Sequence, residues 1–343
     1  MRKLLNSLYV LSEDSYLTLD GENIVVENGS SIAGRYPLHI LENILCFGYR
    51  GASPALMGAC ADKNIGLHFY SPYGKFLARI TGKSLGNVLL RKQQYAISND
   101  NERSLAIVKN MMLGKIYNCR WSIERTLRDH GERVDYEVLK AISLELNDGL
   151  IKVQAATEID GLRGIEGQLA ARYFSVFDKL IINQKDTFEF ITRNRRPPED
   201  NVNALLSFAY TILANDCANA LESNGLDVFV GFMHTDRPGR KSMALDLMEE
   251  LRAILADRFA LTLINKKVIK GDHFERQQDG AVWLNDDGRK VFFKAWQERK
   301  KETIKHPFLN EKVEWGLVPH VQALLLARTI RGDIDEYPPF LWK

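Results

Sequence analysis

Residues 16–26 have the sequence YLTLDGENIVV, in which two mostly apolar runs flank Asp20-Gly21. An Asp-Gly pair suits a tight turn because both residues tolerate positive φ. This stretch therefore predicts a β-hairpin. Around it, residues 4–85 show the alternation and turn residues of short antiparallel strands rather than long helices.

A second hairpin is predicted further along the same region. Residues 67–70 and 76–80 flank the turn sequence Ser71-Pro72-Tyr73-Gly74. Between the two hairpins, Ser53-Pro54 predicts the start of a short helix through Cys60, with serine as its N-cap and proline in its first turn.

After Gly86 the hydrophobic period becomes helical. Helices are expected within 87–152 and at 162–180, 201–224, 242–255 (with Ser242 as N-cap) and 316–331, and Gly225 and Gly332 end two of them. We therefore predict an α+β fold, in which a small N-terminal antiparallel β domain precedes a larger all-α C-terminal domain. The expected boundaries are 1–85 for the β domain, 86–95 for a linker and 96–343 for the helical domain.

The composition indicates a protein that folds without disulfides. The cysteines lack any CxxC pair, so we expect neither a zinc site nor covalent staples but buried free thiols; they are Cys46, Cys60, Cys119 and Cys217. The first residues resemble a secretion signal, but Asn6, Ser7 and Glu13 interrupt the apolar stretch, so no signal peptide is predicted. Since no run of about eighteen apolar residues occurs, we expect a soluble, cytoplasmic protein without membrane contact.

The net charge of +2 does not by itself indicate a nucleic-acid partner. Short basic clusters at 193–196, 237–241 and 299–301 are more informative, because such clusters can follow DNA phosphates. The candidate phosphate contacts are Arg193, Arg195, Arg196, Arg237, Arg240 and Lys241. Salt bridges to helix acids, or plain solvation, explain each of these residues equally well.

Residues 242–252, SMALDLMEELR, place Asp246, Glu249 and Glu250 on one helix face, three and four positions apart. Like charges at this spacing repel by roughly a few tenths of a kcal/mol unless a cation lies near them. The pattern therefore indicates a cation site, although acids in a first turn also favour the helix dipole.

Two further residues complete a candidate centre. His234 precedes this helix by a short loop, and Glu166 lies on another helix between Gly164 and Gly167. Each helical glycine costs roughly 1 kcal/mol relative to alanine, so we expect another backbone or a ligand to approach closely there. Alone, such a Glu or His is ordinarily solvated or hydrogen-bonded. Together, Glu166, His234 and Glu249 suit Mg²⁺ or Mn²⁺ with open positions for phosphate oxygens.

Several ordered motifs then resemble one family, the CRISPR-associated integrases of the adaptation module. The resemblance covers essentially the whole chain, and its motifs lie at 163–167, 195–208, 231–240, 242–252 and 322–328. It implies that Glu166, His234 and Glu249 are the metal ligands and that Asp246 is a supporting acid in catalysis. Some members carry aspartate where Glu249 stands. The chain resembles Type I-C members most.

The resemblance also implies activity and partners. A homodimer, formed through the β domain, is expected to join a small ferredoxin-like CRISPR-associated protein in a hetero-hexamer. This assembly inserts short DNA segments into a CRISPR array when a 3′-hydroxyl attacks a phosphodiester, and it acts on double-stranded and branched DNA without a nucleotide cofactor. Two alternatives stay open: a metal-dependent nuclease for branched or single-stranded DNA, and a non-catalytic DNA-binding scaffold.

Overall fold

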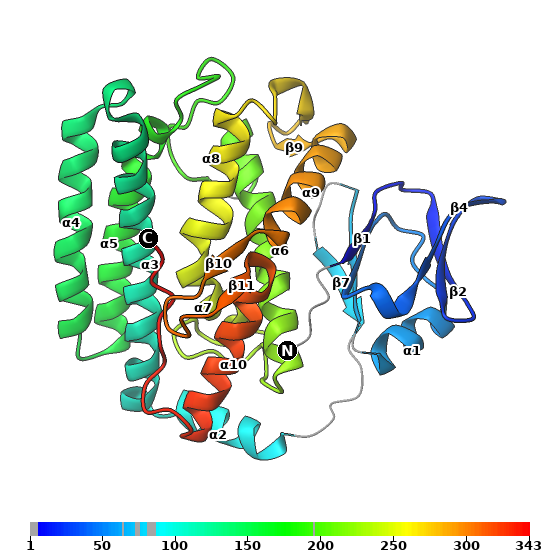
Figure 1. Ribbon diagram of the computed structural model, residues 1–343, viewed down its shortest axis with the longest axis horizontal. Coiled ribbons are helices and arrows are strands. Elements are labelled where there is room, and N and C mark those ends of the chain that lie inside the picture. The colour runs from blue at the N-terminus through cyan, green and yellow to red at the C-terminus, as the bar shows by residue number, and fades with distance from the viewer. Residues whose placement is uncertain (1–5, 64, 73–75, 81–86, 195) are drawn as a thin grey trace.

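The computed structural model describes residues 6–63, 65–72, 76–80, 87–194 and 196–343. A small β-rich part lies beside a larger helical part (Figure 1). The predicted fold class, α+β with strands first and helices after, is confirmed. Residues 73–75, which belong to the turn predicted in the second hairpin, lie outside the described residues.

The N-terminal strands form two sheets. The antiparallel sheet has the order β2-β3-β4, with β2 (Ser15–Asp20), β3 (Asn23–Asn28) and β4 (Ser31–Pro37). The other sheet has the order β1-β5-β6-β7, with β1 (Ser7–Val10), β5 (Asn43–Phe47), β6 (Gly66–Tyr70) and β7 (Phe76–Ile80). Asp20 pairs with Asn23, so the predicted first hairpin turns at Gly21, whose φ is 57°.

The four-stranded sheet is mixed rather than antiparallel throughout. β6 and β7 form the predicted antiparallel hairpin, but β5 runs parallel to both β1 and β6. The reason is helix α1 (Pro54–Asp62), which connects β5 to β6 as a crossover, and a crossover returns the chain in the same direction. The Ser53 hydroxyl accepts a hydrogen bond from the Leu56 amide at 3.3 Å, as its predicted N-cap role requires.

The helical part follows residue 87. Its helices are α2 (Val88–Ser98), α3 (Asn101–His130), α4 (Tyr136–Ala155), α5 (Ile159–Ser175), α6 (Asn201–Ser223), α7 (Ser242–Leu251), α8 (Arg258–Asn265), α9 (Asp286–Lys301) and α10 (Val318–Arg331). Two short hairpins, β8 (Phe274–Arg276) with β9 (Val282–Leu284) and β10 (Thr303–Lys305) with β11 (Lys312–Glu314), lie among them. Gly225 and Gly332, both at φ 80°, follow α6 and α10 as expected.

Helix α7 differs from the predicted helix at both ends. It begins at Ser242, so Lys241 rather than Ser242 is the residue before its first turn. At Arg252 the winding widens into a π-helical segment, Arg252–Asp257, which leads directly into α8. Such π segments are rare and are frequently found at functional sites.

The interval predicted as a linker, 86–95, is largely helical, because α2 begins at Val88. α2 packs against α3 and α10, which buries Leu90 and Ile97. The β-rich part also shares the helical core: the rings of Tyr9 and Phe293 lie 4.1 Å apart. The boundaries 1–85 and 96–343 are therefore proposed here only as a division of the sequence.

The cysteines behave as the composition predicted. All four are buried and free of disulfides: Cys46, Cys60, Cys119 and Cys217. Among the described residues, no helix is both long enough and apolar enough to cross a membrane.

Candidate active site

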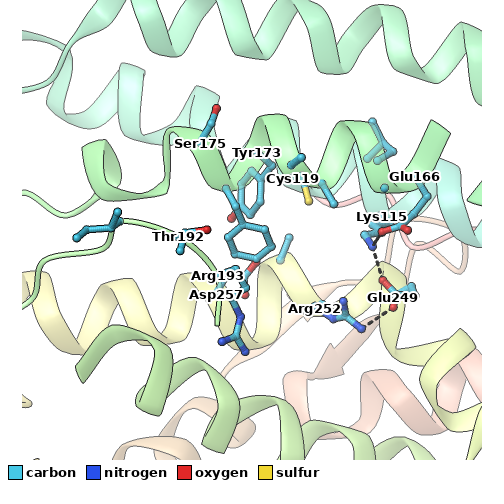
Figure 2. Close-up of a pocket in the computed structure, with 17 residues that line it drawn as sticks. Lys115, Cys119, Glu166, Tyr173, Ser175, Thr192, Arg193, Glu249, Arg252 and Asp257 are labelled. Atoms are coloured by element: carbon cyan, nitrogen blue, oxygen red, sulfur yellow. Dashed lines mark hydrogen bonds and ion pairs between the residues drawn. The ribbon is translucent and has the colours of Figure 1, made fainter. Parts of the chain in front are cut away.

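Three helices bring their charged side chains together in the helical part (Figure 2). Lys115 of α3 lies between Glu166 of α5 and Glu249 of α7. Its Nζ atom pairs with the Glu166 carboxylate and lies 2.6 Å from Oε2 of Glu249. The side chains of Lys115 and Glu249 are only 6% and 5% exposed, so this ion pair is buried.

The close approach of α3 and α7 depends on Gly114. A Cβ atom at this glycine would lie 2.8 Å from Cβ of Glu250, which is closer than real side-chain carbons pack. Because glycine leaves that space open, α7 packs directly on α3 and Glu249 reaches Lys115.

His234 reaches the same place from the loop before α7. Its Nδ1 lies 2.5 Å from Oδ1 of Asp246 and its Nε2 lies 4.0 Å from Oε1 of Glu249. A carboxylate only accepts hydrogen bonds, so Nδ1 of a neutral ring carries the proton and Nε2 keeps its lone pair. Asp246 therefore directs the basic nitrogen of His234 toward Glu249.

Asp246 also fixes the loop that carries His234. It accepts hydrogen bonds from the backbone amides of Phe232, Met233 and His234, at 2.7, 3.0 and 3.0 Å. From the other side, Nε of Arg163 on α5 donates to the Met233 carbonyl at 3.0 Å. Since Arg163 lies one turn from Glu166, the same helix positions both the loop and the acid.

Positive neighbours keep Glu249 ionised. Burial alone would raise its pKa, but the charges of Arg252 and Lys115 outweigh that effect and lower the pKa to about 2. Arg252 is one turn along the chain, with a guanidinium nitrogen 2.5 Å from Oε1 of Glu249. The Oε2 atom is buried without a hydrogen bond and has only its ion pair with Lys115.

A cavity of about 680 Å³ opens beside this cluster. Figure 2 shows Lys115, Glu166 and Glu249 at one side of it, with Thr192 on the opposite side. Its wall also contains Arg193 and Arg252, whose guanidinium carbons lie 5.2 and 5.0 Å from the centre of the Tyr210 ring. The cavity can therefore present both acidic and cationic groups to a ligand.

The predicted basic residues are placed unequally. Arg193 lies in the cavity wall, while Arg196 and Arg237 are exposed and Arg240 is half-buried. Lys241 is turned inward: its Nζ donates to Oδ1 of Asn215 at 2.8 Å and lies 3.7 Å from the centre of the Phe76 ring. Its contacts join α6 to β7. Arg195 lies outside the described residues.

Two expectations about the acids need correction. Among the described residues, no atom lies within 4 Å of a Cβ built at Gly164 or Gly167, so no neighbouring backbone explains these glycines. Asp246, Glu249 and Glu250 also do not share one cation, because Asp246 binds the His234 loop and Glu250 binds the C-terminal segment. Each carboxylate has its own partners, which removes most of the repulsion inferred from their spacing.

Sequence reasoning missed Lys115 and Arg252. Lys115 stands in the run Met111-Met112-Leu113-Gly114-Lys115-Ile116, and a lysine in an apolar helix face is a usable signal for a buried ion pair. Arg252 stands three positions after Glu249, the spacing of a helical ion pair.

The donors fit a divalent cation, although their present arrangement holds an ammonium group. In the part of the chain that the structure describes, no three His, Cys, Asp or Glu side chains are grouped tightly enough to hold one ion. Carboxylates from two helices nevertheless face the same cation, and the imidazole Nε2 lies 4.0 Å from one of them. Oxygen and imidazole donors of this kind suit Mg²⁺ or Mn²⁺.

Comparison with known sequences identifies the family. A family model described as CRISPR associated protein Cas1 matches residues 8–298. A protein of Rhodospirillum rubrum named CRISPR-associated endonuclease Cas1 2 is 49% identical over 349 residues, which cover 100% of each chain. The chain belongs to the Cas1 family of CRISPR-associated proteins.

Solved structures share the fold. A structure titled "Casposase bound to integration product" superposes with a TM-score of 0.84 at 22% identity, over 98% of this chain and 93% of that one. A chain in a structure titled "Cas6-RT-Cas1--Cas2 complex" also gives a TM-score of 0.84, at 23% identity, over 100% of this chain and 36% of that one.

Proposed function

We propose that this chain is a metal-dependent DNA endonuclease and integrase that inserts short DNA segments into a CRISPR array. The observation that carries the proposal is the convergence of Glu166, Glu249 and His234 on one cation position beside a cavity, in a chain of this family. Endonuclease in the names of relatives and the casposase structure support the same activity.

The reaction is a phosphoryl exchange. The 3′-hydroxyl of the inserted DNA forms a new bond to the target phosphorus, and the target's own 3′-oxygen leaves as a hydroxyl. One phosphodiester is made and one is broken, so no nucleotide cofactor is needed. Mg²⁺ or Mn²⁺, when bound, polarises the phosphodiester and stabilises the leaving oxygen.

This chain's own residues hold and orient the centre. Glu166, Glu249 and Nε2 of His234 would hold the ion, while Asp246 fixes the imidazole and its loop. Arg252 keeps Glu249 ionised. Metal-binding histidines commonly have a carboxylate behind them in this way, which raises their basicity.

We further propose the partners. Arg193 in the cavity wall and Arg196, Arg237 and Arg240 near the surface would contact DNA phosphates, which makes binding salt-sensitive. A homodimer formed through the β domain would assemble in the cytoplasm with a small ferredoxin-like partner as a hetero-hexamer. The solved complex whose title includes Cas2 supports a CRISPR-associated partner.

A strand-transfer assay tests the function. A labelled short duplex is incubated with the protein, its partner, Mn²⁺ and a supercoiled plasmid that contains a CRISPR array. We expect a joined product of higher mass that is absent with EDTA. Glu166→Ala and His234→Ala should each lower joining by at least about 100-fold, because a metal site contributes several kcal/mol.

Two controls separate the alternatives. A duplex that lacks its 3′-hydroxyl should block joining but not hydrolysis, so strands that are only shortened would identify a plain nuclease. Asp148→Ala removes an exposed acid of α4 and should join DNA like the unaltered protein. Undiminished joining by both site variants would refute the proposed centre.

The role of Asp246 predicts a smaller, separable effect. Asp246→Asn should lower both Mn²⁺ affinity and the joining rate about 10- to 100-fold, because an amide no longer fixes the His234 tautomer. Isothermal titration calorimetry and the joining assay measure the two effects. Asp236→Asn makes the same change in the exposed part of the loop and should change neither. Equal behaviour of both variants would exclude the positioning role.

A further inference from the structure

Lys115 is the one member of the cluster whose position the proposed mechanism does not explain. Its ammonium group lies between Glu166 and Glu249, the two carboxylates proposed to hold the metal. The side chain is buried, at 6% exposure, and comes from a third helix, α3. The cation that these acids now hold is therefore covalently part of the chain.

The charges of this cluster balance without a metal. Lys115 and Arg252 supply two positive charges, and Glu166 and Glu249 supply two negative ones. A divalent ion bound by both glutamates would occupy the space of the ammonium group and would repel it strongly in a buried site. The ion and the ammonium group therefore compete for the same two acids.

Lys115 has room to move. It lines the cavity of about 680 Å³, and a lysine carries its charge on a flexible four-carbon stem. Displaced from the acids, the ammonium group can turn into the cavity without leaving α3. There it would face an incoming DNA phosphate rather than a carboxylate.

We propose that Lys115 is a tethered counter-ion, which occupies the metal position in the metal-free protein and leaves it when the divalent ion binds. The inference rests on the proposed metal site and adds a residue to it. Lys115 keeps the two acids paired before loading and thereby weakens metal binding. A purely structural Lys115 would instead leave metal affinity unchanged or, if the site distorts without it, lower it.

Titration of the full-length protein with MnCl₂ tests this competition. Lys115→Met keeps the length of the side chain but removes its charge, so Mn²⁺ should bind at least tenfold more tightly than to the unaltered protein. Lys115→Arg keeps the charge and should bind no more tightly. Lys152→Met, on the exposed face of α4, is the matched control and should leave the affinity unchanged.

Thermal unfolding provides the second measurement. Without metal, Lys115→Met should unfold at a lower temperature, and saturating Mn²⁺ should raise its midpoint by more than that of the unaltered protein. If Lys115→Met is unfolded at the start, Lys115→Gln takes its place in both experiments.

The outcomes distinguish the two proposals. Unaltered protein that binds Mn²⁺, with equal or weaker binding by the uncharged Lys115 variant, overturns the counter-ion role alone. Unaltered protein that binds no Mn²⁺, or binds it as well after Glu166→Ala, overturns the metal site and this inference with it.

Discussion

Glu249→Ala is expected to abolish DNA joining and to lower the free energy of unfolding by about 3–5 kcal/mol. Glu249 is buried and pairs with both Lys115 and Arg252. Removing it leaves two positive charges in the interior with one acid, Glu166, between them. Guanidinium-chloride unfolding and the strand-transfer assay measure the two losses.

Two companion variants separate charge from shape. Glu249→Asp keeps the charge and should retain most of the stability. Glu249→Ala combined with Lys115→Met removes one stranded cation and should recover part of the stability, but no joining. Glu249→Ala that unfolds at the denaturant concentration of the unaltered protein would show that the ion pairs contribute little.

The pH dependence follows from the same residue. Its pKa is lowered from 4.5 to about 2, so the folded protein favours the ionised form. The stability that Glu249 contributes is complete above pH 4.5 and is lost as the pH falls toward 2. Glu249→Ala should lack this part of the acid transition.

Glu250→Ala is expected to lower the free energy of unfolding by about 3–5 kcal/mol, by loss of three buried hydrogen bonds. Its carboxylate accepts from the Tyr337 hydroxyl, from Gln322 Nε2 at 2.9 Å and from the Phe340 amide at 2.7 Å. Alanine would leave these donors unsatisfied. Denaturant unfolding measures the loss, and limited proteolysis should show faster cleavage of the C-terminal segment.

The effect of Glu250 extends to the candidate site. The C-terminal segment also binds Asn118 of α3, whose Nδ2 donates to the Phe340 carbonyl at 2.7 Å. Because Asn118 lies one turn from Lys115, the segment holds α3 against α7 where the charged cluster forms. An unchanged unfolding midpoint and an unchanged cleavage rate would contradict this role.

Glu250 should also make stability fall as pH rises. Burial raises its pKa from 4.5 to about 7, although its hydrogen bonds oppose the shift. Between these values the folded protein holds a proton that the unfolded chain has released, so stability declines from pH 4.5 through 7. Glu250→Gln cannot titrate and should decline less over that window; an equal decline would assign the effect to another group.

Local sequence was sufficient for much of the fold. The Asp20-Gly21 turn, the Ser53 cap and the helix ends at Gly225 and Gly332 each depend on neighbouring residues, and each appears in the structure as predicted. The helix within the expected linker was missed, because what stabilises α2 is its packing on α3 and α10, which lie far from it in sequence or in space.

The sequence by itself determined the order of strands and helices and supplied Glu166, His234, Asp246 and Glu249 as the candidate residues. It could do so because hydrophobic period, turn residues and motif spacing are local properties of the chain. Only the tertiary structure decided how these residues are used. Which acid meets which cation depends on the close packing of three helices, and that packing buries Lys115 between Glu166 and Glu249.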